Sequence, residues 1–127
     1  RPPRFVFFPM NAIQFGMSDN RSAYRIVRHL PKELDVHVWQ SDASLDAVVA
    51  LIRRLDVVIS MRFHATIFSL SQNCPPVGID YRIGIKDKVA AVMEDCGESQ
   101  FCCRIDELTS SWIAERLQSR LLSLGEV

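Results

Sequence analysis

The sequence predicts an α/β protein built on a five-stranded, doubly wound parallel sheet. Two observations support this class. Short apolar runs alternate along the 127 residues with segments whose apolar residues follow helical spacing. One run, at residues 57–59, is entirely β-branched, which is typical of a parallel strand covered on both faces. The expected connections are right-handed crossovers, and the expected strand order is 2-1-3-4-5, which places the switch point between the first and third strands.

The expected elements follow one another without long gaps. Strands are expected at residues 4–9, 35–39, 56–59, 77–81 and 100–104, and helices at residues 19–30, 45–55, 65–72, 88–96 and 107–122. Ser41 or Ser44 should cap the second helix and Asp106 the last, since their side chains can accept from first-turn amides. Gly97 should end the fourth helix. His37 lies within the second strand and is interpreted as a structural residue.

Composition excludes several classes of function. Formal net charge is zero, so we expect no nucleic-acid or membrane-surface partner. No apolar run approaches the roughly 20 residues of a membrane span. The four cysteines lack the spacing of a metal site and are interpreted as reduced core residues of a cytoplasmic protein, with Cys96 facing inward. No Gly-rich phosphate loop is present, and we expect no cofactor.

The most informative stretch runs from residue 56 to residue 66, where a strand leads into a helix. Val57, Val58 and Ile59 should be fully buried, and the chain must turn before the helix. Arg62 and His64 lie in this turn. A helix N-terminus beside an arginine favours an anion such as a phosphate or carboxylate, and the loop at residues 10–18 should face the same crevice.

The segment SMRFHATIFSLSQNCPPVGIDY resembles the signature of the polysaccharide pyruvyl transferase family. The resemblance covers residues 56–97. The residues that fit are Arg62, Phe63, His64, Ala65, Pro76, Val77, Ile79, Asp80, Tyr81, Lys88, Val89 and Gly97. The chain departs from the family pattern in one place, because the gap between Tyr81 and Lys88 is longer than usual.

The resemblance implies a two-domain architecture of the GT-B kind. Residues 1–127 would form a single Rossmann-like domain, the C-terminal half of a transferase whose N-terminal half is missing from this chain. The implied reaction moves the pyruvyl group of phosphoenolpyruvate onto two hydroxyls of a sugar or glycan acceptor. The product is a ketal in polysaccharide biosynthesis, and we expect that the fragment alone is inactive.

The resemblance also suggests roles for six residues. Arg62 would hold the anionic donor, and His64 would act as general acid, because an imidazole can hold either protonation state near neutral pH. Phe63 would pack beneath these two side chains. The other expected substrate-binding residues are Lys88, Arg82 and Tyr81; solvated charges and simple packing explain these three equally well.

Two other classes stay open. The chain could be a sugar- or nucleotide-binding Rossmann-like module without chemistry of its own. A receiver-like signalling domain would need an acidic residue after the third strand, where the chain has Ser60 and Met61. It would also need a lysine after the fifth strand, where Cys103 and Arg104 stand. The receiver class therefore ranks third.

Overall fold

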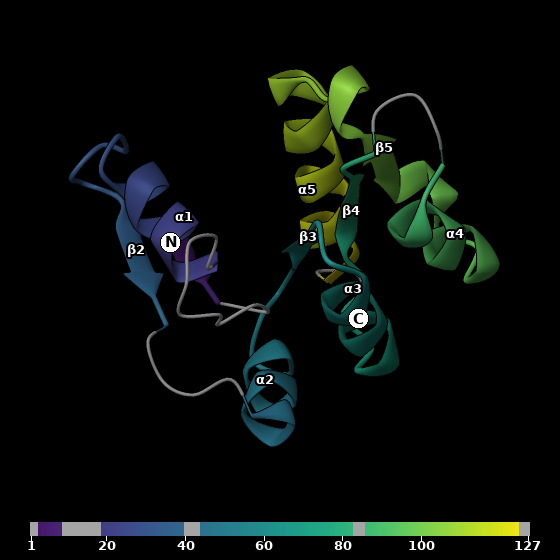
Figure 1. Cartoon of the computed structure of the whole chain (residues 1–127), viewed down its shortest axis with the longest axis horizontal. Coiled ribbons are helices and arrows are strands. Elements are labelled where there is room, and N and C mark those ends of the chain that lie inside the picture. Colours follow the sequence, from purple (N-terminus) through teal and green to yellow (C-terminus); the bar gives the residue numbers. More distant parts are fainter. Residues whose placement is uncertain (1–2, 9–18, 40–43, 83–85, 125–127) are drawn as a thin grey trace. The chain divides into compact units, whose positions relative to one another are not determined.

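A computed structural model describes residues 3–8, 19–39, 44–82 and 86–124 of the chain. Within these residues, five strands alternate with five α-helices, which confirms the mixed α/β class (Figure 1). All strand pairs are parallel, and they form one two-stranded and one three-stranded sheet. The chain divides into two compact units, Arg1–Ala47 and Val48–Val127, and each is described by itself. The predicted loop at residues 10–18 lies outside the described residues.

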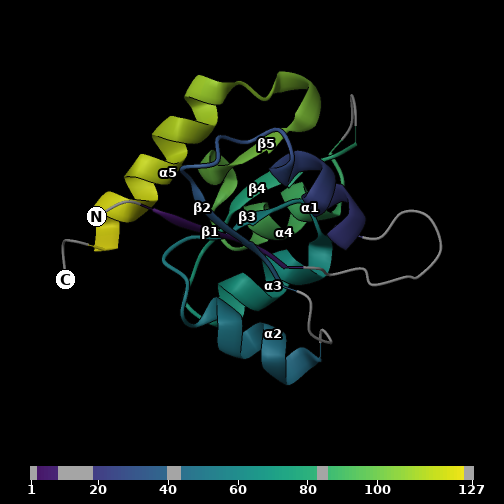
Figure 2. The ribbon, with the colours of Figure 1, turned by 90° about the vertical axis from the view of Figure 1, so that its left-hand side faces the viewer.

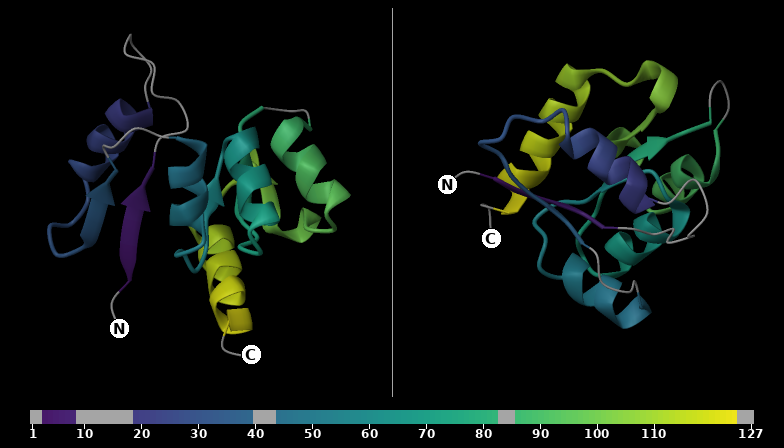
Figure 3. Two further views of the ribbon diagram at one scale, coloured as in Figure 1. Left: turned by 90° about the horizontal axis from the view of Figure 1, so that it is seen from below. Right: turned by 60° about the vertical axis from the view of Figure 1, so that its left-hand side comes forward.

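The first unit pairs β1 (Arg4–Phe7) with β2 (Asp35–Val38) in parallel (Figure 3). The ends of these strands are joined by an ion pair, with Arg4 Nε 3.0 Å from Asp35 Oδ2. His37 is exposed, and its Nε2 lies 2.7 Å from Asp35 Oδ1, which agrees with a structural role. Helix α1 (Asp19–Val27) is shorter than predicted, because residues 28–30 form a turn instead.

Helix α2 (Leu45–Ile52) begins where the sequence predicted. The Ser44 Oγ accepts a hydrogen bond from the Ala47 amide at 3.2 Å, so Ser44 caps this helix. The alternative cap, Ser41, lies outside the described residues. Val48 and Ile52, one turn apart on the helix, are buried.

The second unit is built on the three-stranded sheet, in the order β3 (Ile59–Ser60), β4 (Val77–Asp80), β5 (Cys102–Arg104). Ser60 is the register partner of Gly78, and Asp80 is the partner of Arg104. All four residues of the central strand β4 are buried. This burial is the pattern of a parallel strand with both faces covered.

The expectation that Val57, Val58 and Ile59 are all fully buried is wrong. Val58 is 2% exposed, Val57 is half-buried and Ile59 is 48% exposed. The strand β3 contains only Ile59 and Ser60, and Val58 joins the ladder through its carbonyl, which accepts from the Val77 amide at 2.8 Å. Neighbouring side chains of a strand point to opposite faces, so Val58 and Ser60 share the covered face and Ile59 lies on the other.

Helix α3 (Phe63–Ser71) follows β3, and α4 (Lys88–Asp95) follows β4. The buried core joins Val77 of β4 to Val89 and Met93 of α4 and to Phe101. Gly78 allows this close packing, because a Cβ at that position would lie 3.1 Å from Val89 Cγ1.

Helix α5 (Ser110–Leu124) is the C-terminal element of the second unit (Figure 2). Trp112, Ile113 and Leu117 pack against the core. The predicted apolar stripe ends early, however, because Leu121 and Leu122 are exposed.

The end of α4 and the start of α5 are two helix boundaries for which the sequence predicted a capping residue. Gly97 has φ +73°, and the Glu98 amide donates to the Met93 carbonyl at 2.8 Å, so Gly97 ends α4 as predicted. The expectation that Asp106 caps α5 is wrong. Asp106 belongs to a short 3-10 helix, Ile105–Glu107, and the Trp112 amide instead donates to Thr109 Oγ1 at 3.1 Å.

Arg120 connects α5 to the strand layer. Its Nη2 donates to the Pro76 carbonyl and to Glu98 Oε2, both at 2.8 Å. Its guanidinium carbon lies 3.4 Å from the ring centroid of Phe101, in a cation–π contact. The side chain is largely buried, and its Nε has no hydrogen-bond partner among the described residues. One side chain therefore ties α5 to the residue before β4 and to the core.

We predict that Thr109→Ala lowers the free energy of unfolding by about 1 kcal/mol, because the Trp112 amide loses its acceptor. Asp106→Ala is the matched control and should change stability by less than about 0.5 kcal/mol. Urea denaturation of both variants measures the difference. A larger loss for Asp106→Ala would restore the cap that the sequence suggested.

Candidate functional site

Two buried hydroxyl groups fix the turn between β3 and α3. The Arg62 carbonyl accepts from Ser60 Oγ at 3.0 Å, from Thr66 Oγ1 at 2.8 Å and from the Thr66 amide at 3.0 Å. The two hydroxyl oxygens lie 2.9 Å apart, and both residues are buried. Because the Arg62 carbonyl has three donors, the peptide that opens the helix is held in one orientation.

The N-terminus of α3, which follows this turn, is electrostatically positive. Arg62 is the N-cap residue, with φ −107° and ψ 137°, and no side chain among the described residues caps the helix. The first turn contains no acidic residue. The first amides of a helix have no intrahelical acceptor and carry the positive end of the helix dipole. Arg62 is exposed at this end, so an anion would meet both a guanidinium and backbone N–H groups.

His64 lies in the first turn of α3, between two phenylalanine rings. Its ring centroid is 5.5 Å from that of Phe63 in an edge-on arrangement, and 6.3 Å from that of Phe68. Phe63 is half-buried, whereas His64 is exposed. The two rings restrict the imidazole while leaving it open to solvent. The prediction that Arg62 and His64 bind one anion stays a prediction.

A second group of polar residues follows β4. Asp80, the last residue of the strand, is 0% exposed. Its Oδ2 accepts from the Asp87 amide at 2.7 Å, and the Arg82 amide lies 3.4 Å from its Oδ1. The Arg82 Nε lies 3.2 Å from Asp87 Oδ2. Lys88 opens α4 and is exposed, and Tyr81 is 50% exposed.

The topology brings both groups to one edge of the sheet. Strands β3 and β4 are adjacent and parallel, and Ser60 is in register with Gly78. The carboxyl ends of adjacent parallel strands lie at the same edge, which is where open α/β sheets bind ligands. Arg62, Phe63 and His64 follow one strand. Tyr81, Arg82 and Lys88 follow the other.

Sequence reasoning gave no role in the site to three buried polar residues of this edge, Ser60, Thr66 and Asp80, although Asp80 is among the residues that fit the family signature. A weak signal was present for each. Ser60 ends an apolar run, Thr66 stands four residues after the N-cap, and Asp80 interrupts the apolar strand at residues 77–81. Their roles depend on hydrogen bonds to the main chain, which spacing alone does not reveal.

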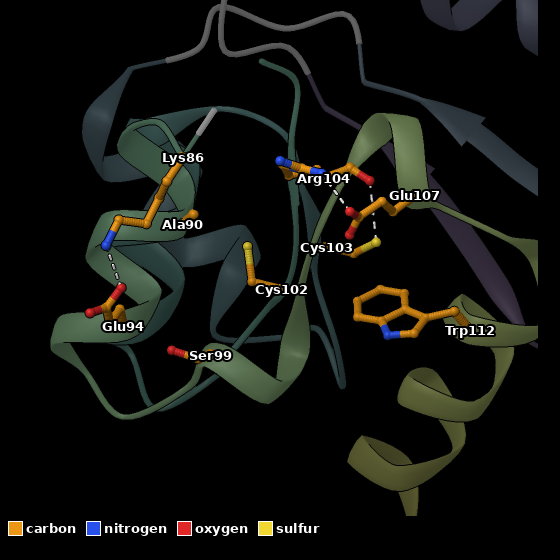
Figure 4. A pocket seen from close by; sticks show the side chains of 9 residues that line it. All are labelled: Lys86, Ala90, Glu94, Ser99, Cys102, Cys103, Arg104, Glu107 and Trp112. Carbon is orange, nitrogen blue, oxygen red and sulfur yellow. Dashed lines mark hydrogen bonds and ion pairs between the residues drawn. The ribbon is translucent and has the colours of Figure 1, made fainter. Parts of the chain in front are cut away.

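A pocket of about 460 Å³ lies elsewhere, beside β5 (Figure 4). None of the six predicted site residues lines it. Its charged side chains are already paired, with Lys86 Nζ 2.6 Å from Glu94 Oε2 and Arg104 bonded to Glu107. We therefore place the candidate site at the ends of β3 and β4, where cationic groups and helix amides meet, and not in this pocket.

The thiols beside β5 are poorly suited to nucleophilic chemistry. Burial, reinforced by the negative charge of Asp80, raises the pKa of Cys102 to about 11. Burial also raises the pKa of Cys103 and of Cys74. All four cysteines are free, as predicted, but the expectation that Cys96 faces inward is wrong, since it is exposed at the end of α4.

Metal and membrane sites find no support in the part of the chain that is described. No group of three or more histidine, cysteine, aspartate or glutamate side chains there could hold a metal ion. Among the helices described, none is both long and apolar enough to cross a membrane.

Parallel strands followed by a cationic helix start define an α/β domain suited to an anionic ligand. The chain belongs to the polysaccharide pyruvyl transferase family, whose family model matches residues 4–82. Five of the six predicted site residues fall within the match, and Lys88 falls after it. The family name indicates a transferase with a glycan acceptor. Comparisons with curated proteins and with solved structures gave no match.

We predict that Thr66→Val lowers the free energy of unfolding by about 1 kcal/mol, because the valine keeps the shape and removes one donor to the Arg62 carbonyl. Ser71→Ala is the control. It removes an exposed hydroxyl that also donates to a carbonyl, and should cost less than about 0.5 kcal/mol. Equal losses in urea denaturation would show that the buried pair has no special role.

We predict that iodoacetamide labels Cys96 first at about pH 8, because thiolate is the reactive form and a raised pKa leaves little thiolate on Cys102. Labelling of Cys102 should accelerate as the pH rises towards its pKa of about 11. Peptide mass spectrometry gives the order, and the denatured chain is the control. Equal rates for these two cysteines in the folded chain at about pH 8 would contradict the prediction.

Proposed function

We propose that this chain is the donor-binding domain of a polysaccharide pyruvyl transferase that uses phosphoenolpyruvate. Membership of the family is the observation that carries the proposal. The start of α3 supports it, because phosphoenolpyruvate carries a carboxylate and a phosphate, and a helix start that none of the described side chains caps, beside Arg62, suits either group.

The proposed reaction adds two sugar hydroxyl oxygens to the central carbon of phosphoenolpyruvate. The methylene carbon gains a proton and becomes a methyl group. The bond from the central carbon to the phosphate oxygen breaks, phosphate leaves, and a ketal remains. One hydroxyl proton balances the new methyl group, and the other leaves with the phosphate.

Each predicted residue has a role in this scheme. Arg62 binds the donor through charge-assisted hydrogen bonds, and His64 donates a proton to the methylene carbon or to the departing phosphate. Phe63 packs against the imidazole and restricts its orientation. Lys88 and Arg82 add positive charge toward the donor phosphate. Tyr81, half exposed after β4, contacts the sugar.

The proposal includes a larger architecture. The observed orders, β1 beside β2 and β3-β4-β5, are the pairings that a 2-1-3-4-5 sheet requires, and β1 beside β3 would complete a doubly wound, Rossmann-like sheet. A second, N-terminal domain would supply the acceptor side of a GT-B cleft. The four free cysteines suit the reducing cytoplasm, where we propose that the enzyme acts.

We predict that phosphoenolpyruvate binds the 127-residue chain and that Arg62→Ala weakens binding by about 10- to 150-fold, the value of one charge-assisted contact. His64→Asn should leave binding nearly intact while lowering turnover of a whole transferase about 10²- to 10⁴-fold. Titration followed by NMR shifts measures the affinities.

Arg53→Ala is the matched control, because Arg53 is also exposed in the second unit but pairs with Gln72 at the far end of α3. An unchanged affinity in Arg62→Ala would refute the proposed donor site. If the wild-type chain binds phosphoenolpyruvate but the His64→Asn transferase keeps full turnover, His64 has no chemical role. This domain would then only bind the donor.

A further inference from the structure

The carboxylate of Asp80 is fully buried at the carboxyl end of β4. A buried carboxylate is costly unless hydrogen bonds replace the water that it loses. Here the donors are two main-chain amides, those of Asp87 at 2.7 Å and of Arg82 at 3.4 Å. Asp80 therefore spans both ends of the segment that connects β4 to α4.

The same segment also contains an ion pair between two side chains. Asp87 is the N-cap residue of α4, yet its side chain makes no cap hydrogen bond. Its Oδ2 instead lies 3.2 Å from Arg82 Nε. Asp80 thus holds the main chain of Arg82 and Asp87, and Asp87 in turn holds the Arg82 side chain. The first residue of α4, Lys88, follows directly in sequence.

We propose that Asp80 is a positioning residue, which fixes Arg82 and Lys88 at the edge of the sheet shared with Arg62 and His64. This inference rests on the proposed function, in which these cations face the donor phosphate. The connection between Tyr81 and Lys88 is longer than in the family pattern. Without a fixed contact, it would let the Arg82 and Lys88 side chains occupy many positions, and ordering them would carry an entropic cost when the donor binds. Two hydrogen bonds to one rigid, buried carboxylate remove that freedom before binding.

The test is Asp80→Asn, because asparagine keeps the size of the side chain but replaces one acceptor by a donor. Phosphoenolpyruvate affinity of the 127-residue chain should fall about tenfold, the lower end for one charge-assisted contact. Asp56→Asn is the control. It neutralises an exposed carboxylate ahead of β3 and should change affinity less than twofold, as expected of an exposed charge.

A double-mutant cycle separates positioning from general loss of stability. If Asp80 acts through Arg82, then Arg82→Gln should weaken binding in the wild-type background and cost less than about twofold more in Asp80→Asn. Additive effects would overturn the proposal, and so would an Asp80→Asn chain with unchanged affinity.

Hydrogen exchange of the Asp87 amide tests the same contact without a ligand. The measurement on the wild-type chain does not depend on whether a variant folds. Slow exchange at Asp87, lost in Asp80→Asn, supports the proposal. Exchange in the wild-type chain as fast as at an exposed loop amide would overturn it. A wild-type chain that binds no phosphoenolpyruvate would instead contradict the proposed function, and the Asp87 amide would then decide the role of Asp80.

Discussion

The burial of β4 is the constraint on which the second unit depends. A strand without a solvated face leaves no water for its polar groups, so each group needs a partner within the protein. The neighbouring strands supply partners for its main chain, and Arg120 binds the carbonyl of the preceding Pro76. The main-chain amides of Arg82 and Asp87 donate to the Asp80 carboxylate. Polar side chains therefore gather where β4 enters and leaves the core. The leaving end is also the edge at which parallel sheets bind ligands.

The elements that the sequence predicted correctly are those fixed by local chemistry. The alternation of strands and helices, the Ser44 cap and the Gly97 helix end each depend on neighbouring residues. The failures concern packing at longer range. The β-branched run at residues 57–59 could not show that Ile59 lies on an uncovered face. Likewise, Asp106 and Thr109 are both good caps, and only the short 3-10 helix at residues 105–107 decides between them.

The candidate site also contains residues that local sequence indicates and residues that only the folded structure reveals. Arg62 and His64 could be named as candidates from the sequence, because they lie in one turn between a strand and a helix, and the family match includes that turn. The residues that hold the turn could not, since Ser60 and Thr66 act through a carbonyl between them. Asp80 bridges residues up to seven positions away. The exposed charges of the site are thus a local property, whereas their placement depends on buried hydroxyl and carboxylate groups.

Arg120 has a consequence for how the second unit comes apart. Its guanidinium joins α5 to Pro76, Glu98 and Phe101 at once, so displacing it would expose a core ring and strip a carbonyl beside β4. Three leucines follow it and are exposed: Leu121, Leu122 and Leu124. Little buried apolar surface is therefore lost when this end of the helix unwinds. Proteins open in cooperative units whose limits follow such contacts. Arg120 therefore marks the limit between a helix end that can fray alone and a segment that unfolds only together with the core.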